Sequence, residues 1–123
     1  MGKKQINTIQ VLNNKEIQAL SDLIEKVTFN RSAHLHYHGH VPLAGHLFLE
    51  GEIVLSSKTT DSIRPQVGSV IGALELINNE PLKISVQIGP QSEVGILDRS
   101  TIHEIMNHPD PTIRDIIYKI LCK

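Results

Sequence analysis

The stretch GSVIGALELINNEPLKIS, from Gly68 to Ser85, decides how the rest of the chain is interpreted. Gly68 predicts a tight turn, and the apolar residues that follow predict a short strand over 69–71. Gly72 then opens one predicted helical turn, which the run NNEP ends, and a further strand is predicted to begin at Ile84. A glycine ahead of a short helix leaves backbone N–H groups that point to one spot. Such groups are suited to holding a phosphate.

The order of glycines, small polar residues and apolar residues in this stretch resembles the phosphate-binding cassette of cyclic-nucleotide-binding domains, the family of the catabolite activator protein and the cyclic-nucleotide-gated channels. Gly39, Gly51 and the run LFLEGEIVL match the family's turn and strand pattern at the same separation. The resemblance implies a mainly β fold, a double-stranded β-helix or jelly-roll barrel with an N-terminal helix and C-terminal helices. We therefore expect an N-terminal lead-in at residues 1–12 and a cyclic-nucleotide-binding-like domain at residues 13–123.

The ligand-binding residues of the family's cassette are largely missing from this chain. In the family, a glutamate that bonds the ribose follows the glycine, whereas Ala73 follows Gly72 here. The family's phosphate-pairing arginine falls just before the small hydroxyl residue that Ser85 matches, where this chain has lysine and isoleucine. Loss of one partner of a buried charge pair costs about 2–5 kcal/mol, which would weaken a micromolar site towards millimolar. The resemblance thus implies a degenerate pocket formed by Gly72, Ala73, Leu74, Glu75, Lys83, Ile84 and Ser85.

Glu75 occupies a position that the family usually gives to glycine, alanine or serine. A carboxylate there would repel a phosphate. An acidic residue in the first turn of a helix is also favourable in itself, because it faces the free amides. We therefore expect this carboxylate to accept hydrogen bonds from the amides that a phosphate would otherwise occupy, and we expect no useful affinity for cyclic AMP or cyclic GMP.

The run HLHYHGH places a histidine at every second position. Alternate residues of an extended segment share one face, so the run predicts a row of imidazoles about 7 Å apart. Such pairs bind zinc, nickel or copper, and cupins use an HxH pair with a later glutamate and histidine. No later strand is expected to supply a histidine, because His103 and His108 fall in the closing helices. A solvent-facing polar row is the first interpretation, and a metal or pH-sensing site is the alternative. The residues concerned are His34, His36, His38 and His40.

Apolar spacing predicts helices at both ends of the chain. The segment KEIQALSDLIEKV predicts an amphipathic helix that Asn13 or Asn14 caps. Asp98 or Ser100 is expected to cap the helix TIHEIMN, and Pro111 suits the first turn of a last helix. Between the helices, many short strands with regular glycine and proline breaks predict a sandwich or barrel. These strands are expected near residues 27–30, 33–38, 45–50, 52–57, 62–64, 69–71, 84–89 and 92–98.

The last helix carries a broad apolar stripe, and in the family the last helix often carries dimerisation. If only half of the stripe packs on the β-strands, the remainder would be free for a two-fold partner. The alternative is that the whole stripe covers the core. The stripe consists of Ile113, Ile116, Ile117, Ile120 and Leu121.

Composition narrows the classes of function. At 123 residues the chain is expected to form one domain, and a net charge of −1 argues against non-specific nucleic-acid binding. No apolar run reaches the roughly 18 residues of a membrane span, and the lone Cys122 allows no internal disulfide. The sequence has no Walker loop, nucleophile elbow or Cys-x-x-Cys motif, so we expect neither an enzyme nor a cofactor. It ends at Lys123 without a helix-turn-helix, so we expect no DNA binding.

The sequence therefore predicts a stand-alone regulatory or signalling domain in the cytoplasm. It is expected to have lost cyclic-nucleotide binding and to act through a protein partner or a second copy of itself. Two alternatives stay open. The first is a sensor of a cyclic nucleotide or another small ligand, in which Lys83 and Ser85 hold a different anion or Glu75 holds an amine. The second is a cupin-like metal-binding protein built on the histidine row.

Overall fold

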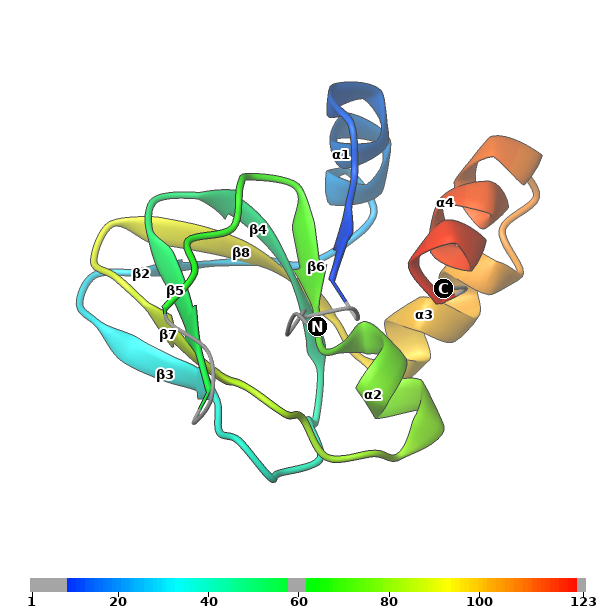
Figure 1. Ribbon diagram of the computed structural model, residues 1–123. Helices are drawn as coiled ribbons and strands as arrows, with labels where there is room; N and C mark the ends of the chain where they lie inside the picture. Colours follow the sequence, from blue (N-terminus) through cyan, green and yellow to red (C-terminus); the bar gives the residue numbers. More distant parts are fainter. Residues whose placement is uncertain (1–8, 58–61, 122–123) are drawn as a thin grey trace, which may run out of the picture.

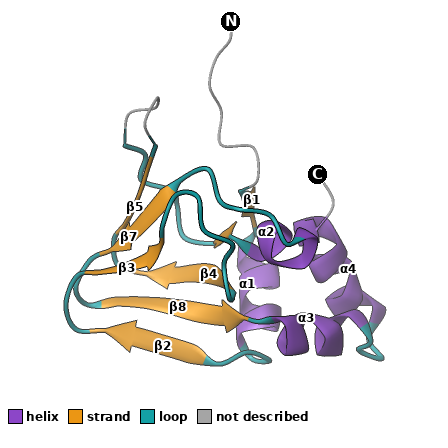
Figure 2. Cartoon of the chain, turned by 90° about the horizontal axis from the view of Figure 1, so that it is seen from below, coloured by secondary structure: helices purple, strands orange, loops and turns teal. Residues whose placement is uncertain are grey.

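Two antiparallel sheets, packed face to face, make up the β part of the computed structural model, which describes residues 9–57 and 62–121. One sheet has five strands in the order β1-β6-β4-β8-β2, and the other has three in the order β3-β7-β5. The helices gather at one end of the sheets (Figure 1 and Figure 2). The strands are β1 (Gln10–Val11), β2 (Lys26–Phe29), β3 (Ala33–His36), β4 (Gly45–Glu50), β5 (Ile53–Ser56), β6 (Ser69–Ile71), β7 (Ser85–Ile88) and β8 (Ser92–Leu97).

This arrangement confirms the expected mainly β, jelly-roll-like fold, although the described strands form two sheets and not one closed barrel. Successive residues of β4 point to opposite faces of its sheet. Leu47 lies in the core between the five-stranded sheet and the helices, and Phe48 lies in the interior between the two sheets. The strand expected near residues 62–64 is reduced to a single bridge between Leu55 and Ile63.

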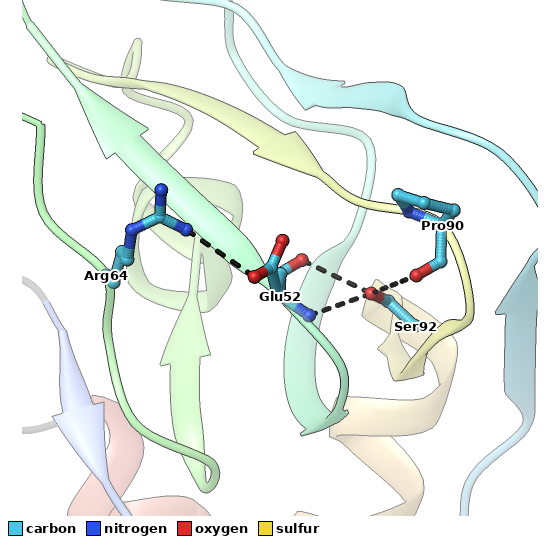
Figure 3. A network of polar contacts seen from close by, with 4 residues as sticks. All are labelled: Glu52, Arg64, Pro90 and Ser92. Atoms are coloured by element: carbon cyan, nitrogen blue, oxygen red, sulfur yellow. Dashed lines mark hydrogen bonds and ion pairs between the residues drawn. The ribbon is translucent and has the colours of Figure 1, made fainter.

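The chain changes from one sheet to the other at the turn between β4 and β5. Gly51 has φ +102°, and a Cβ there would overlap the backbone and hydroxyl of Ser92 on β8. The fully buried Ser92 Oγ accepts a hydrogen bond from the Glu52 N–H at 2.9 Å (Figure 3). The Glu52 carboxylate also lies 3.9 Å from Arg64, but both side chains are exposed, so this pair adds little stability. The glycine and the serine together fix the corner at which the sheets meet.

The N-terminal helix α1 (Asn14–Ser21) is shorter than the sequence predicts. Asn13 caps it, and the Asn13 and Glu16 side chains form a capping box with each other's backbone N–H at 2.9 Å. The helix ends at Ser21 because the chain must turn to pair β2 with β8, and this leaves Leu23 42% exposed. Before this helix, β1 pairs with β6 and Leu12 is buried, so residues 10–12 contact the rest of the chain.

The remaining helices are α2 (Ala73–Asn78), α3 (Arg99–Met106) and α4 (Pro111–Leu121). Asp98 is the N-cap of α3, because its carboxylate accepts a hydrogen bond from the Thr101 N–H at 2.8 Å. Pro111 opens α4, as predicted. No helix in the described part of the chain combines the length and the apolar character needed to cross a bilayer.

The apolar stripe of α4 faces its own chain. Its four isoleucines are buried among residues of α1, α3 and the five-stranded sheet, and Ile117 is completely inaccessible. The partly buried Leu121 packs against the same cluster. The stripe therefore covers the core, which is the second of the two interpretations left open above. These side chains are not exposed for a two-fold partner: Ile113, Ile116, Ile117 and Ile120. Cys122 lies outside the described residues.

Candidate functional site

The cassette is a strand–glycine–helix unit in which two glycines are required for steric reasons. Gly72, between β6 and α2, has φ +88° and ψ −7°, a left-handed conformation that favours glycine. Gly45 opens β4 directly beneath α2, and a Cβ there would lie 2.8 Å from the backbone N and Cα of Ala73. The helix is therefore held against the sheet by close backbone contact.

The position of the family's arginine contains no inward-facing cation. Lys83 is exposed, and within the described residues it forms no ion pair. Ile84, the next residue, is 4% exposed and lies in the apolar interior between the sheets. The hydroxyl of Ser85 accepts a hydrogen bond from the His38 N–H at 3.1 Å, so this oxygen is already engaged by the chain itself. None of these three residues therefore presents an inward-facing cation that could form a charge-assisted hydrogen bond with a phosphate.

Glu75 does not act as predicted. Its side chain is 6% exposed, its Oε1 atom has no hydrogen-bond partner, and α2 has no side-chain cap. The prediction that its carboxylate satisfies the free amides is therefore wrong. The N-cap of α2 differs from that of α1: Asn13 is extended at φ −83° and forms a capping box with Glu16, whereas Gly72 is left-handed and has no side chain with which to form one.

The four histidines of HLHYHGH do not form a shared face. A bulge in the pairing of β3 with β7 falls between His34 and His36, and the strand ends at His36. His36 is 5% exposed, whereas the other three are exposed, and His34 stacks on Tyr37 with 4.8 Å between ring centroids. The prediction of an imidazole row is wrong, because the bulge breaks the two-residue period on which it depends. The alternative interpretation, that the histidines face solvent, holds for the other three and is wrong only for His36.

The partner of His36 is a histidine that the sequence analysis did not consider. His46 lies on β4, and its Nδ1 atom is 3.0 Å from the Nε2 atom of His36. His46 alternates with Phe48, so it points into the interior between the sheets, and this pattern was the available signal. The expectation that no later strand supplies a histidine is therefore wrong.

Both imidazoles are neutral near pH 7. Burial lowers the pKa of His36 to about 4, and burial together with the neighbouring His36 lowers the pKa of His46 to about 3. The pair lies against the cassette, because a Cβ at Gly72 would be 3.2 Å from the His36 Nε2 atom. Over residues 9–57 and 62–121, no three histidine, cysteine or acidic side chains converge as a metal site would require.

A surface cleft of about 590 Å³ lies at the other end of α2. The Arg99 guanidinium donates a hydrogen bond to the Leu76 carbonyl at 2.6 Å on its wall, and Leu43 is 92% exposed at its edge. None of the seven residues of the expected pocket lines this cleft.

Several solved structures share the fold. A protein of a cyclic-GMP-dependent signalling pathway that regulates bacterial phytopathogenesis is 14% identical, with 89% of each chain covered and a TM-score of 0.76. The Thermus thermophilus catabolite activator protein is 15% identical over 89% of this chain and 54% of its own, with a TM-score of 0.65. The regulatory domain of Toxoplasma gondii PKA, crystallised with cAMP, is 21% identical over 88% of this chain and 42% of its own, with a TM-score of 0.61.

This chain thus spans about half the length of the last two proteins. No protein-family model matches the sequence, and no curated protein does. At these identities the likeness establishes the fold, which is that of cyclic-nucleotide-binding domains.

Proposed function

We propose that this chain, which has the fold of a cyclic-nucleotide-binding domain, is a regulatory domain that does not bind cyclic AMP or cyclic GMP and acts through protein contacts. The proposal rests mainly on the absence of an inward-facing cation at the position where the family has its phosphate-pairing arginine. The cation at Lys83 faces solvent, and the inward-facing residue is Ile84 in an apolar cluster. Lysine in this place would in any case offer a point charge and not the planar fork that grips a phosphate.

Two further features support the loss of nucleotide binding. The His36 ring occupies the space beside Gly72, and it is neutral because burial lowers its pKa to about 4. Glu75 adds a buried carboxylate three residues into the same helix. A phosphate at the cassette would therefore meet a negative group and no compensating cation, and a buried charge without a partner is costly.

Calorimetry with cyclic AMP and cyclic GMP tests the proposal. We expect no binding heat at ligand concentrations up to about 1 mM, because loss of the arginine contact alone costs about 2–5 kcal/mol. A micromolar dissociation constant for either nucleotide would overturn it. Such binding would return the protein to the class of cyclic-nucleotide sensors.

A restored cassette provides the complementary test. The triple variant Ala73→Glu, Glu75→Ala, Ile84→Arg supplies the ribose and phosphate contacts that the family resemblance implies, and we expect it to gain affinity for cyclic AMP. The matched control is Lys83→Arg, which adds a guanidinium on the exposed side of the same segment and should gain nothing. Circular dichroism establishes that both variants are folded. Binding by the control would show that an exposed cation suffices, contrary to the proposal.

The protein-contact role has its own test, because nucleotide binding and partner binding are independent. The full chain, immobilised through its C-terminus, is expected to retain a partner from native lysate at salt concentrations that remove charge-driven binders. The partner is then required to bind the chain directly, in purified form, with a dissociation constant that cyclic AMP does not change. A partner whose binding depends on added cyclic AMP would contradict the proposal.

A second candidate function is a sensor of a small amine or organic cation, and one observation favours it. The Oε1 atom of Glu75 is buried without a hydrogen-bond partner, and orphaned buried acceptors are uncommon in folded proteins. A cationic ligand would supply the missing donor. Thermal-shift measurements with a panel of primary amines and guanidines, repeated on Glu75→Gln, test this function. A shift that the variant retains would place the ligand elsewhere.

A further inference from the structure

The hydrogen bond between His36 and His46 joins the two sheets. His36 ends β3 in the three-stranded sheet, and His46 is the second residue of β4 in the five-stranded sheet. In the described part of the chain, no other bond between two side chains links a strand of one sheet to a strand of the other. The rest of this interior is apolar, and its buried members are Phe48, Ile53, Leu55, Ile71, Leu82, Ile84 and Val86.

The bond can exist only while the two facing nitrogens carry one proton between them. A hydrogen bond between two imidazoles needs one nitrogen as donor and the other as acceptor, so both facing nitrogens cannot carry protons. When one ring gains a second proton and the other follows, the contact becomes two like-charged donors 3.0 Å apart. Protonation of the pair therefore breaks the link between the sheets.

The surroundings offer no partner within the sheets for a protonated ring. Val86 of β7 is the register partner of His36, and Ile71 and Ile96 are the register partners of His46 on β6 and β8. The titratable residue of α2 is Glu75, and it forms no hydrogen bond with either ring. The imidazolium form is thus disfavoured while the sheets are closed and favoured once they separate.

We propose that the His36–His46 bond is an acid-released latch, which holds the two sheets together beside the cassette and opens that end of the interior when both rings take up protons. The opening is expected next to Gly72, because the His36 ring lies directly beside this residue. The inference is independent of whether a nucleotide binds.

Hydrogen exchange at pH 7.0 and pH 5.5, corrected for the intrinsic rate, measures the opening. An exposed histidine has an ordinary pKa of about 6.5, so exposure of one ring makes opening about eight-fold more favourable at the lower pH, and exposure of both makes it about seventy-fold more favourable. We expect this change at the amides of residues 45–47 and 70–72. These amides should also exchange faster than those of α4 at both pH values, because the opening is local.

Two variants isolate the latch. In His36→Gln/His46→Gln, two amides can still share a hydrogen bond but do not titrate, so the pH dependence at residues 45–47 and 70–72 should disappear. His36→Leu/His46→Leu serves the same purpose if the amide pair does not fold. The matched control is His38→Gln, an exposed histidine in the same run, which should behave as the natural chain does.

Three results would overturn the proposal. The first is protection in the natural chain that is equal at the two pH values. The second is pH dependence that persists in the non-titrating variants. The third is exchange of the strand amides at the same rate as the slowest amides of α4, since the opening would then be global unfolding and not release of a local contact.

Discussion

Replacing Glu75 with methionine should stabilise the protein, although it removes a side chain that is 6% exposed. The buried Oε1 atom accepts no hydrogen bond, and an unsatisfied buried acceptor costs about 1–3 kcal/mol. Methionine has a similar length, favours helices about as well as glutamate and adapts to irregular spaces. The net expectation is therefore a gain of about 1–3 kcal/mol in the free energy of unfolding.

Urea unfolding at pH 7 measures this change directly. The midpoint should rise without a change in the slope, because the surface exposed on unfolding is almost unaltered. A thermal scan should show a rise of about 4 °C for each kcal/mol in a domain of this size. Glu75→Gln removes the carboxylate but keeps a buried polar group at the same place. The rise in its free energy of unfolding should therefore be smaller than that of Glu75→Met.

The matched control is Glu80→Met, which removes the same charge from an exposed position just after α2. Its effect should lie within about 0.5 kcal/mol of zero, as for most surface substitutions. The reasoning is refuted if Glu75→Met lowers the free energy of unfolding by more than about 1 kcal/mol while the control is neutral. That result would mean that the carboxylate has a stabilising partner in solution, such as a bound cation.

Three further outcomes are expected. The folded-state pKa values of about 4 for His36 and about 3 for His46 lie below the unfolded value of about 6.5. The stability that the neutral pair confers is therefore complete above about pH 6.5 and is lost as the pH falls. The free energies of unfolding from urea titrations at pH 7 and pH 5 should differ by up to about 2 kcal/mol for each ring. Gly51→Ala should lower the melting temperature sharply, because its Cβ would overlap Ser92, and a neutral result in calorimetry would contradict the corner described above. Ile117→Asp should unfold the chain, as circular dichroism would show, because a charge would enter the core between α4 and the sheet; a folded variant would show that the helix packs otherwise.

The parts of the fold that the sequence predicts well are those set by neighbouring residues. β4 and β6 lie at the predicted residues, because alternating apolar positions and flanking glycines are local signals. The caps of α1 and α3 fall on one of the two candidates proposed for each, Asn13 and Asp98. The end of α1 was missed because the pairing of β2 with β8, which is distant in sequence, overrides the helical pattern.

The candidate site depends on contacts that no local pattern contains. The His36–His46 bond needs a bulge in β3 and the approach of two sheets, and neither follows from the alternation in HLHYHGH. The behaviour of Glu75 depends on how α2 packs: its side chain is buried and its Oε1 atom has no hydrogen-bond partner, whereas the first-turn position of the residue predicts a carboxylate that faces the free amides. The residue types at the cassette therefore predict that the arginine is missing. They do not predict that a histidine pair and a buried carboxylate lie there.

The close approach of Gly45 to the backbone of Ala73 bears on how glycine signatures are used to assign receptors. This spacing serves the joint between a strand and a short helix, and it is demanded whether or not any metabolite is ever captured. A glycine at this place therefore reports how a helix is seated on a strand, and it is not by itself evidence that a small molecule binds.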